Sequence, residues 1–248
     1  MDELRKMWLA EEKHAFSGWD FSHLNGRAVS EPLPWDYRTE ALRGLEPGHR
    51  ILDMDTGGGE MLLSLGHPFE NTAVTEAYAP NLALCREKLA PLGVEVAGAD
   101  GEKPLPFADG RFDRVLNRHG SFLSGELFRI LKPGGVFVTQ QVGARNCFDL
   151  RERLGFAMPE CDHDLAHNRE MLEKAGFEIV RAEENFGKCR FYDTGAVVFH
   201  AKIIEWEFPG FSVEKNWEQL MDIQREIEQE GCIEATEHRF LIVARKEN

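Results

Sequence analysis

Short apolar runs alternate with amphipathic stretches between residues 50 and 143. Short apolar runs bounded by turn residues are typical of buried strands, and apolar residues three or four positions apart are typical of helices. The pattern predicts strands at 50–54, 72–76, 94–98, 112–117 and 136–142, and helices at 59–66, 80–91 and 121–131. Because such alternation is the mark of βαβ units, we predict a parallel sheet with right-handed crossovers.

Residues 50–60, Arg-Ile-Leu-Asp-Met-Asp-Thr-Gly-Gly-Gly-Glu, join the first predicted strand to the first predicted helix. Backbone without Cβ lets a ligand approach closely, so this turn predicts a nucleotide-like ligand at the end of the strand. Gly57 and Gly59 fit the first two glycines of a dinucleotide fingerprint, but Leu62 occupies the third position. No Gly-Lys-Ser/Thr follows, which excludes a P-loop. Glu76 lies where an acidic residue that accepts from ribose hydroxyls is expected.

Four further segments, together with this turn, make the chain resemble the class I S-adenosylmethionine-dependent methyltransferases, and among them the type 11 methyltransferases. The segments are 96–101, 105–115, 126–135 and 175–177. The resemblance covers residues 45–185 and the last predicted strand, at 236–245. It implies a Rossmann-like α/β fold with a seven-stranded, mostly parallel sheet, helices on both faces, and S-adenosylmethionine as the cofactor.

The resemblance also implies the residues that hold the cofactor. They are Asp53, Asp55, Thr56, Gly57, Gly59, Glu76, Ala77, Asp100, Gly101 and Asn117. In this assignment Glu76 accepts from the ribose hydroxyls and Asp100 from the adenine amine. Asp55 departs from the family, which usually has glycine at this position. An aspartate there either turns its side chain away, meets the ligand's ammonium group, or weakens the cofactor site.

We expect three parts: an N-terminal helical lid at 1–45, a methyltransferase core at 46–186 plus 236–248, and an inserted cap at 187–235. In the family such a lid forms part of the substrate wall. The aromatic residues Trp19, Trp35 and Tyr192 are therefore the candidate substrate contacts. The alternatives are plain packing of these aromatics and, for the insert, a contact in a homodimer.

His119 follows the end of the fourth predicted strand, where the methyl group should emerge. Its imidazole could take a proton near pH 7, so it is the candidate catalytic residue, as a general base or a substrate contact. The alternative is a histidine that packs against the cofactor or bonds to the backbone.

Cys161, His163 and His167 raise the question of a metal, because two histidines four apart share a helix face. Asp162 and Asp164, however, also fit an N-cap and first-turn charges. The spacing supplies no fourth ligand, so no metal is expected.

The net charge of −14 disfavours a nucleic-acid partner, which usually requires clustered Lys and Arg. No apolar run approaches the ~18 residues that a membrane span needs, and the start lacks the pattern of a secretory signal. The five scattered cysteines fit reduced thiols in the cytoplasm. We therefore expect methylation of a small molecule, with RNA or protein methylation, or non-catalytic nucleoside binding, as the alternatives.

Overall fold

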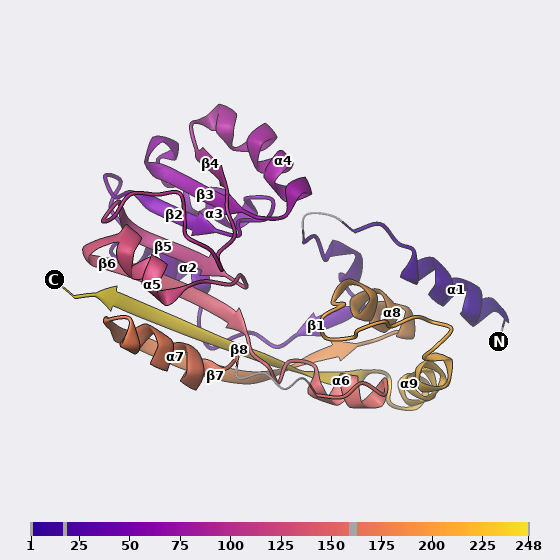
Figure 1. The fold of residues 1–248 in the computed structure, drawn as a ribbon. Coiled ribbons are helices and arrows are strands. Elements are labelled where there is room, and N and C mark those ends of the chain that lie inside the picture. Colours follow the sequence, from indigo (N-terminus) through magenta and orange to yellow (C-terminus); the bar gives the residue numbers. More distant parts are fainter. Residues whose placement is uncertain (1, 17–18, 159–162, 248) are drawn as a thin grey trace. The chain divides into compact units, whose positions relative to one another are not determined.

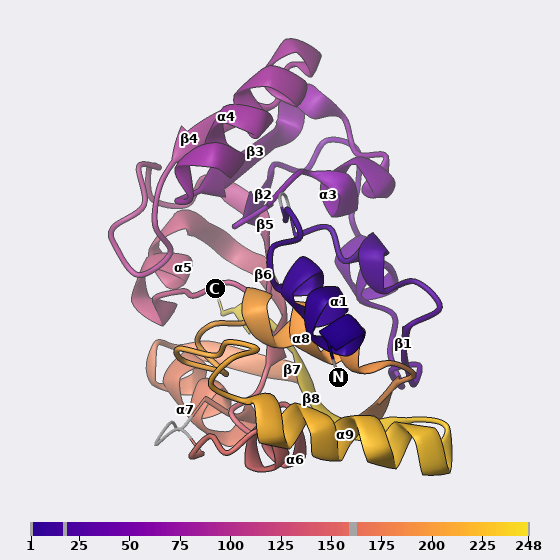
Figure 2. The same cartoon turned by 90° about the vertical axis from the view of Figure 1, so that its right-hand side faces the viewer.

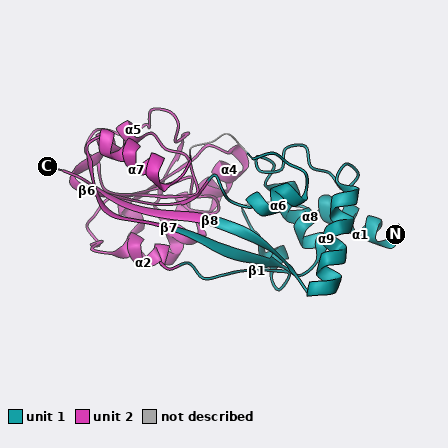
Figure 3. Ribbon diagram, turned by 90° about the horizontal axis from the view of Figure 1, so that it is seen from below, with its two compact units in different colours: residues 1–33, 144–162, 185–238 teal, residues 34–143, 163–184, 239–248 magenta. Residues whose placement is uncertain are grey.

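The computed structural model describes residues 2–16, 19–158 and 163–247, which form two compact units (Figure 3). Unit 1 comprises residues 1–33, 144–162 and 185–238, and unit 2 comprises residues 34–143, 163–184 and 239–248. Each unit has its own cluster of buried apolar side chains. These boundaries differ from the three parts expected from the sequence, since residues 34–45 fall within unit 2 and residues 144–162 within unit 1.

Parallel strands form the centre of unit 2, and helices surround them (Figure 1). The strands are β2 (Ile51–Met54), β3 (Thr72–Glu76), β4 (Glu95–Gly98), β5 (Phe112–Arg118) and β6 (Leu131–Val142). The helices are α2 (Tyr37–Leu42), α3 (Glu60–Leu65), α4 (Ala79–Lys88), α5 (Ser124–Ile130) and α7 (Leu165–Lys174), with 3-10 turns at Phe69–Asn71 and Ala90–Leu92. The predicted alternation of strands and helices between residues 50 and 143 is therefore confirmed.

Two long strands, β7 (Phe177–Phe191) and β8 (Ile233–Lys246), run through both units. The strand order is β1-β7-β8-β6-β5-β2-β3-β4, and β8 pairs antiparallel with β6. The eighth strand was not expected. It is β1 (Ala28–Ser30), within the predicted lid, which pairs antiparallel with the end of β7.

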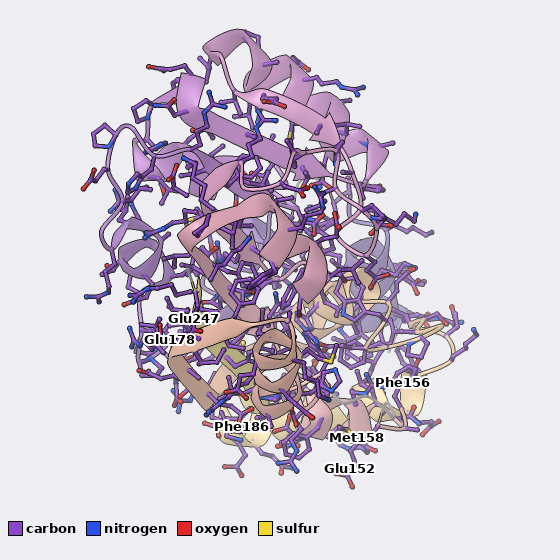
Figure 4. All side chains as sticks on the ribbon, turned by 60° about the vertical axis from the view of Figure 1, so that its left-hand side comes forward. Glu152, Phe156, Met158, Glu178, Phe186 and Glu247 are labelled. Carbon is purple, nitrogen blue, oxygen red and sulfur yellow. The ribbon has the colours of Figure 1, made fainter. Side chains whose placement is uncertain are left out.

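Unit 1 is built around α8 (Thr194–Ile203), whose central residues Ala196, Val197, Val198 and Phe199 are all buried. Helices α1 (Asp2–Glu12) and α9 (Trp217–Glu230) pack on α8 (Figure 2). Unit 1 also contains a 3-10 turn at Ser22–Leu24 and α6 (Phe148–Arg153), and Phe156 packs its ring on Phe208 (Figure 4).

Helix ends follow their local sequence, with two corrections. The amphipathic pattern of residues 1–16 predicts a helix over this whole stretch, but the first helix ends at Glu12. Ser212 is of a residue type that favours N-caps, but α9 begins at Trp217 after Asn216, and the Ser212 hydroxyl accepts from the Lys215 N–H. Gly231 ends α9, with a φ of 84° that glycine adopts without steric cost. No helix in the described ranges is long and apolar enough to cross a lipid bilayer.

Candidate cofactor-binding site

The glycine turn after β2 bends through a run of positive φ angles. They are 52° at Asp55, 63° at Gly57 and 82° at Gly59, which immediately precedes α3. L side chains rarely adopt this left-handed conformation, but glycine does so freely and Asp is among the residues that tolerate it best. Asp55 therefore keeps the backbone conformation that a glycine would provide at this position. Its departure from the family pattern adds a carboxylate without changing the path of the chain.

Glu76 holds the turn from the neighbouring strand. Its buried carboxylate accepts hydrogen bonds from the Gly57 N–H through Oε2 and from the Tyr78 N–H through Oε1, both at 3.0 Å. Inside the turn, the Thr56 hydroxyl donates to Asp53 Oδ2 at 2.6 Å. Hydrogen bonds to carboxylates are stronger than those between neutral groups. The ends of β2 and β3 are thus fastened together around one short loop.

A cavity of about 500 Å³ opens beside Glu76 and reaches Asp100. It is lined by Glu76, Ala77, Leu82, Gly98, Ala99, Asp100, Lys103, Pro104 and Pro106. Asp100 Oδ1 accepts from the Glu102 N–H at 2.9 Å, and Oδ2 lies 3.0 Å from the Lys103 ammonium. The two acidic residues that the sequence separates by 24 positions therefore share one cavity next to the glycine turn.

Negative charge accumulates at this site. Burial is the main reason that the pKa of Asp55 rises to about 7, and the charges of Glu76 and Asp100 raise it further. The pKa of Asp53 rises to about 6, again chiefly through burial, although the Thr56 hydrogen bond and the Arg118 charge oppose the shift. Clustered carboxylates repel one another and favour a positively charged ligand. S-adenosylmethionine carries a sulfonium and an ammonium group, so the charge of the site fits this cofactor.

Gly101 and Asn117 lie where the backbone approaches closely. A Cβ on Gly101 would come within 2.0 Å of the Ser121 carbonyl oxygen, so only glycine fits there. Asn117 is fully buried and its Oδ1 accepts from the Gln141 amide at 2.6 Å. Its Nδ2 has no hydrogen-bond partner within the described chain. A buried donor of this kind is costly unless a ligand or water satisfies it.

His119, at a φ of 65°, is hydrogen-bonded to Gln140, which is hydrogen-bonded in turn to Trp35. The Trp35 indole N–H donates to Gln140 Oε1 at 2.8 Å, and Gln140 Nε2 lies 3.1 Å from His119 Nε2. Indole nitrogen can only donate, so it fixes the orientation of the Gln140 amide, whose NH₂ group then donates to His119 Nε2. The imidazole therefore accepts at Nε2 and carries its proton on Nδ1.

The charge state of His119 agrees with this arrangement. His119 is exposed by its surface area, yet desolvation of its ring is the largest cause that lowers its pKa to about 3, followed by the charges of Arg239 and Arg118. Both arginines act in the same direction as desolvation, so the imidazole is neutral at pH 7. The geometry favours His119 as a donor to a substrate over His119 as a general base.

Two residues near this site were not expected from the sequence. Gln140 connects Trp35 to His119, and Tyr37 is buried close enough to Asp53 that burial and the Asp53 charge raise its pKa well above the usual value. Tyr37 lies in the aromatic cluster Pro-Trp-Asp-Tyr at 34–37. That cluster could have indicated it, whereas nothing in the sequence distinguishes Gln140.

The other candidate residues fall outside the glycine turn. Trp19 and Tyr192 belong to unit 1, whereas Trp35 belongs to unit 2. Trp19 is half exposed and meets the Trp206 ring edge-on at 5.8 Å, and the Tyr192 N–H donates to the Arg27 carbonyl.

The histidines considered for a metal serve local contacts. His163 lies 3.3 Å from the Asn168 amide, and the His167 N–H donates to Asp164, which caps α7. Cys161 and Asp162 lie outside the described residues.

Comparisons with known proteins agree with this geometry. Residues 52–139 match the family model described as a methyltransferase domain. A protein-L-isoaspartate O-methyltransferase from Rhodopseudomonas palustris is 33% identical over 117 residues, which make up 46% of this chain and 53% of the relative. A demethylmenaquinone methyltransferase from Thermus thermophilus is 36% identical over 116 residues, or 43% of this chain and 53% of the relative. The chain thus spans about half the length of these curated relatives.

A solved structure is similar over nearly the whole chain. It is that of a functionally unknown protein from Deinococcus radiodurans R1, with a TM-score of 0.58 at 17% identity, covering 99% of this chain and 98% of the other. At this identity the likeness concerns the fold alone. The family match covers the strands and the glycine turn that form the site described above. Residues 52–139 therefore form a methyltransferase domain, similar to those of the class I S-adenosylmethionine-dependent methyltransferases.

Proposed function

We propose that this protein transfers a methyl group from S-adenosylmethionine to a small-molecule acceptor. The observation that carries the proposal is the position of Glu76, which binds the glycine turn through Gly57 and also lines the cavity that reaches Asp100. These two carboxylates could accept from ribose hydroxyls and from the adenine amine, respectively. Asp53 and Asp55 would offset the positive charge of the methionine portion.

When bound, the cofactor supplies a methyl group already activated by the sulfonium charge. The chain then needs mainly to align the acceptor and exclude water. His119 would contribute by donating a hydrogen bond from Nδ1, because its Nε2 is engaged by Gln140. Asn117 Nδ2, which is buried, offers a second donor beside the site. We assign the substrate wall to Trp35, the aromatic candidate that belongs to the same unit as the glycine turn.

Direct binding of the cofactor is the first test. Isothermal titration of the protein with S-adenosylmethionine should give saturable heat, and the demethylated product S-adenosylhomocysteine should bind as well. Absence of heat from either ligand at millimolar concentration would refute cofactor binding. Binding of both ligands without turnover on any acceptor class would favour a non-catalytic nucleoside-binding protein.

The acceptor class is tested with methyl-labelled cofactor. We expect label to enter a low-mass metabolite fraction rather than an isoaspartyl peptide or RNA, since the net charge of −14 disfavours polyanions. The isoaspartyl peptide matters because one relative is named for that substrate. Label in the peptide alone would replace the small-molecule proposal with protein methylation.

The cysteines support a cytoplasmic location. Cys85, Cys147, Cys189 and Cys232, the cysteines in the described ranges, form no disulfide, and reduced thiols are typical of that compartment. Cell fractionation should recover the protein with cytoplasmic markers. Recovery in a periplasmic or extracellular fraction would contradict this location.

A further inference from the structure

Three side chains of different chemistry converge in unit 1. Cys147, His200 and Glu207 each offer a ligand atom, and these atoms all lie within 4.8 Å of one another. Cys147 and Glu207 are buried, and His200 is half-buried. We propose that Cys147, His200 and Glu207 bind a zinc ion. The site would be separate from the glycine turn, since its ligands are all in unit 1 and the turn is in unit 2.

The three ligand residues lie at or next to the ends of helices α6 and α8. Cys147 precedes α6 at a φ of 51°, and its N–H donates to the Thr236 carbonyl of β8 at 2.8 Å. His200 lies in the last turn of α8, and Glu207 lies in the turn that follows, where its N–H donates to Ile204. A non-glycine residue at positive φ costs conformational energy and often marks a functional position.

The distance between the Cys147 and His200 ligand atoms matches zinc geometry. Cys147 Sγ and His200 Nε2 are 3.7 Å apart. Zinc–sulfur and zinc–nitrogen distances of about 2.3 and 2.0–2.1 Å at a tetrahedral angle place the two ligand atoms about 3.6 Å apart. The same distance also fits a hydrogen bond between the thiol and the imidazole, which is the contact expected when no ion is bound. One ion between them accounts for the spacing without moving either side chain.

Neighbouring groups orient the ligands, as is usual around protein metals. The buried Asn146 amide donates to Glu207 Oε1 at 2.8 Å and to Cys147 Sγ at 3.3 Å. Asn146 is held in turn by the His238 N–H, which donates to its Oδ1 at 3.2 Å. The ring of His238 stacks on Phe186, one of the side chains labelled in Figure 4. One asparagine therefore contacts two of the three ligands.

The mixture of donors selects the kind of ion. Thiolate and imidazole favour zinc and other late transition metals, whereas calcium and magnesium prefer oxygen ligands alone. Three protein ligands with a carboxylate among them leave a fourth position for water, as in zinc sites that are not closed. Bound zinc would join the segment before α6 to the end of α8 and so stabilise unit 1, because an ion that binds only the folded chain shifts the unfolding equilibrium.

The experiment uses the protein of 248 residues, freed of metal with a chelator and then titrated with zinc against a competing fluorescent chelator. We expect one equivalent per chain, and a rise in melting temperature of roughly 5–10 °C at a hundredfold excess over Kd. Cobalt in place of zinc should give thiolate-to-metal charge-transfer absorption. The variants Cys147→Ser, His200→Gln and Glu207→Gln should each lose at least about 100-fold in affinity, and Asn146→Ala about 10–100-fold.

Cys232→Ser and His49→Gln are the matched controls, since they remove a thiol and an imidazole elsewhere. Both should bind zinc as the unaltered protein does. Should one ligand variant fail to fold by circular dichroism, the cobalt spectrum of the unaltered protein still reports whether a thiolate is a ligand. The proposal is wrong if the unaltered protein takes up no stoichiometric zinc, or if folded ligand variants bind it equally well.

Discussion

The glycine-turn site of unit 2 and the cluster of Cys147, His200 and Glu207 in unit 1 are formed by different kinds of structural element. In unit 2, Asp53 and Glu76 lie at the carboxyl ends of β2 and β3, and Asp100 follows β4; these parallel strand ends meet at one edge of the sheet. In unit 1, Cys147, His200 and Glu207 come from a loop, a helix and a turn without a shared motif. The unit 2 site can be predicted from the sequence because its residues lie at the ends of regular strands. The unit 1 cluster cannot, because it depends on the packing of irregular segments.

The two groups also differ in charge. At the glycine-turn site, burial is the main reason that the pKa values of Asp53 and Asp55 rise, and the charge of the Glu76 carboxylate raises both further. The unit 1 cluster combines a thiol, an imidazole and a carboxylate, each of which is a side-chain type that binds zinc. The first arrangement fits an organic cation and the second fits a metal ion. Variants that affect one site and leave the other unchanged test this distinction.

The largest expected effect is a steric one at the cofactor site. Gly101→Ala places a Cβ 2.0 Å from the backbone oxygen of Ser121, which cannot move as a flexible side chain would. We expect the free energy of unfolding to fall by ~1–3 kcal/mol, measured in urea. Gly48→Ala is the control, because no atom lies within 4 Å of its added Cβ. Equal stability of the two variants would mean that the loop at Gly101 adapts. Zinc uptake should be the same in both.

Loss of the Glu76 charge should have the next largest effect. Glu76→Gln keeps the shape of the side chain but weakens its bonds to Gly57 and removes an acceptor for the ribose. Affinity for S-adenosylmethionine should fall about 10–100-fold in calorimetry, since hydrogen bonds to charged groups contribute about 1.5–3 kcal/mol. Glu102→Gln, an exposed neighbour, should change affinity little. If the two variants bind alike, Glu76 does not contact the ligand.

Asp55 should make stability depend on pH. Its pKa of about 7 in the folded chain exceeds the usual 3.8, so the folded state keeps a proton that the unfolded state releases. The bound proton makes its whole contribution to the free energy of unfolding at low pH, and this contribution is lost as the pH rises from about 4 to about 7. Asp55→Asn removes this loss, and asparagine also tolerates positive φ.

Above pH 7, the free energy of unfolding of the Asp55→Asn protein should therefore exceed that of the unaltered protein by ~1–2 kcal/mol, a value that takes partial solvent screening into account. Near pH 4 the two proteins should be equally stable. Melting curves across this range measure the gap. In parallel, the affinity of the unaltered protein for S-adenosylmethionine should rise between about pH 6 and pH 8, and that of the variant should stay flatter. A gap that does not change with pH would show that Asp55 titrates normally.

The smallest effect is expected at Trp35. Trp35→Phe removes the indole donor to Gln140, which costs ~0.5–1.5 kcal/mol of stability and frees the amide to rotate. His119 could then be protonated more easily, so its pKa should rise from about 3 toward its usual 6.5. Proton NMR of the imidazole measures the change, and Trp206→Phe, at an exposed indole of unit 1, is the control. An unchanged titration would show that Gln140 keeps its orientation without Trp35.

Much of unit 2 could be predicted from the sequence because its order is local. Alternating apolar runs located β2 to β6, and the spacing of Gly57, Gly59 and Glu76 predicted a turn beside an acidic strand end. Unit 1 was less predictable, since β1 is only three residues long and the start of α9 depends on a preceding turn. Pairing of a short edge strand is decided by its neighbour rather than by its own residues.

The sequence by itself determined the parallel sheet, the glycine turn and the acidic residues at the strand ends. Their chemistry follows from periodicity and from short spacings along the chain. Only the tertiary structure decided the positive φ of Asp55, the proton position on His119 and the meeting of Cys147 with His200. These depend on side chains far apart in sequence, whose approach is fixed by packing and hydrogen bonding that no local pattern encodes.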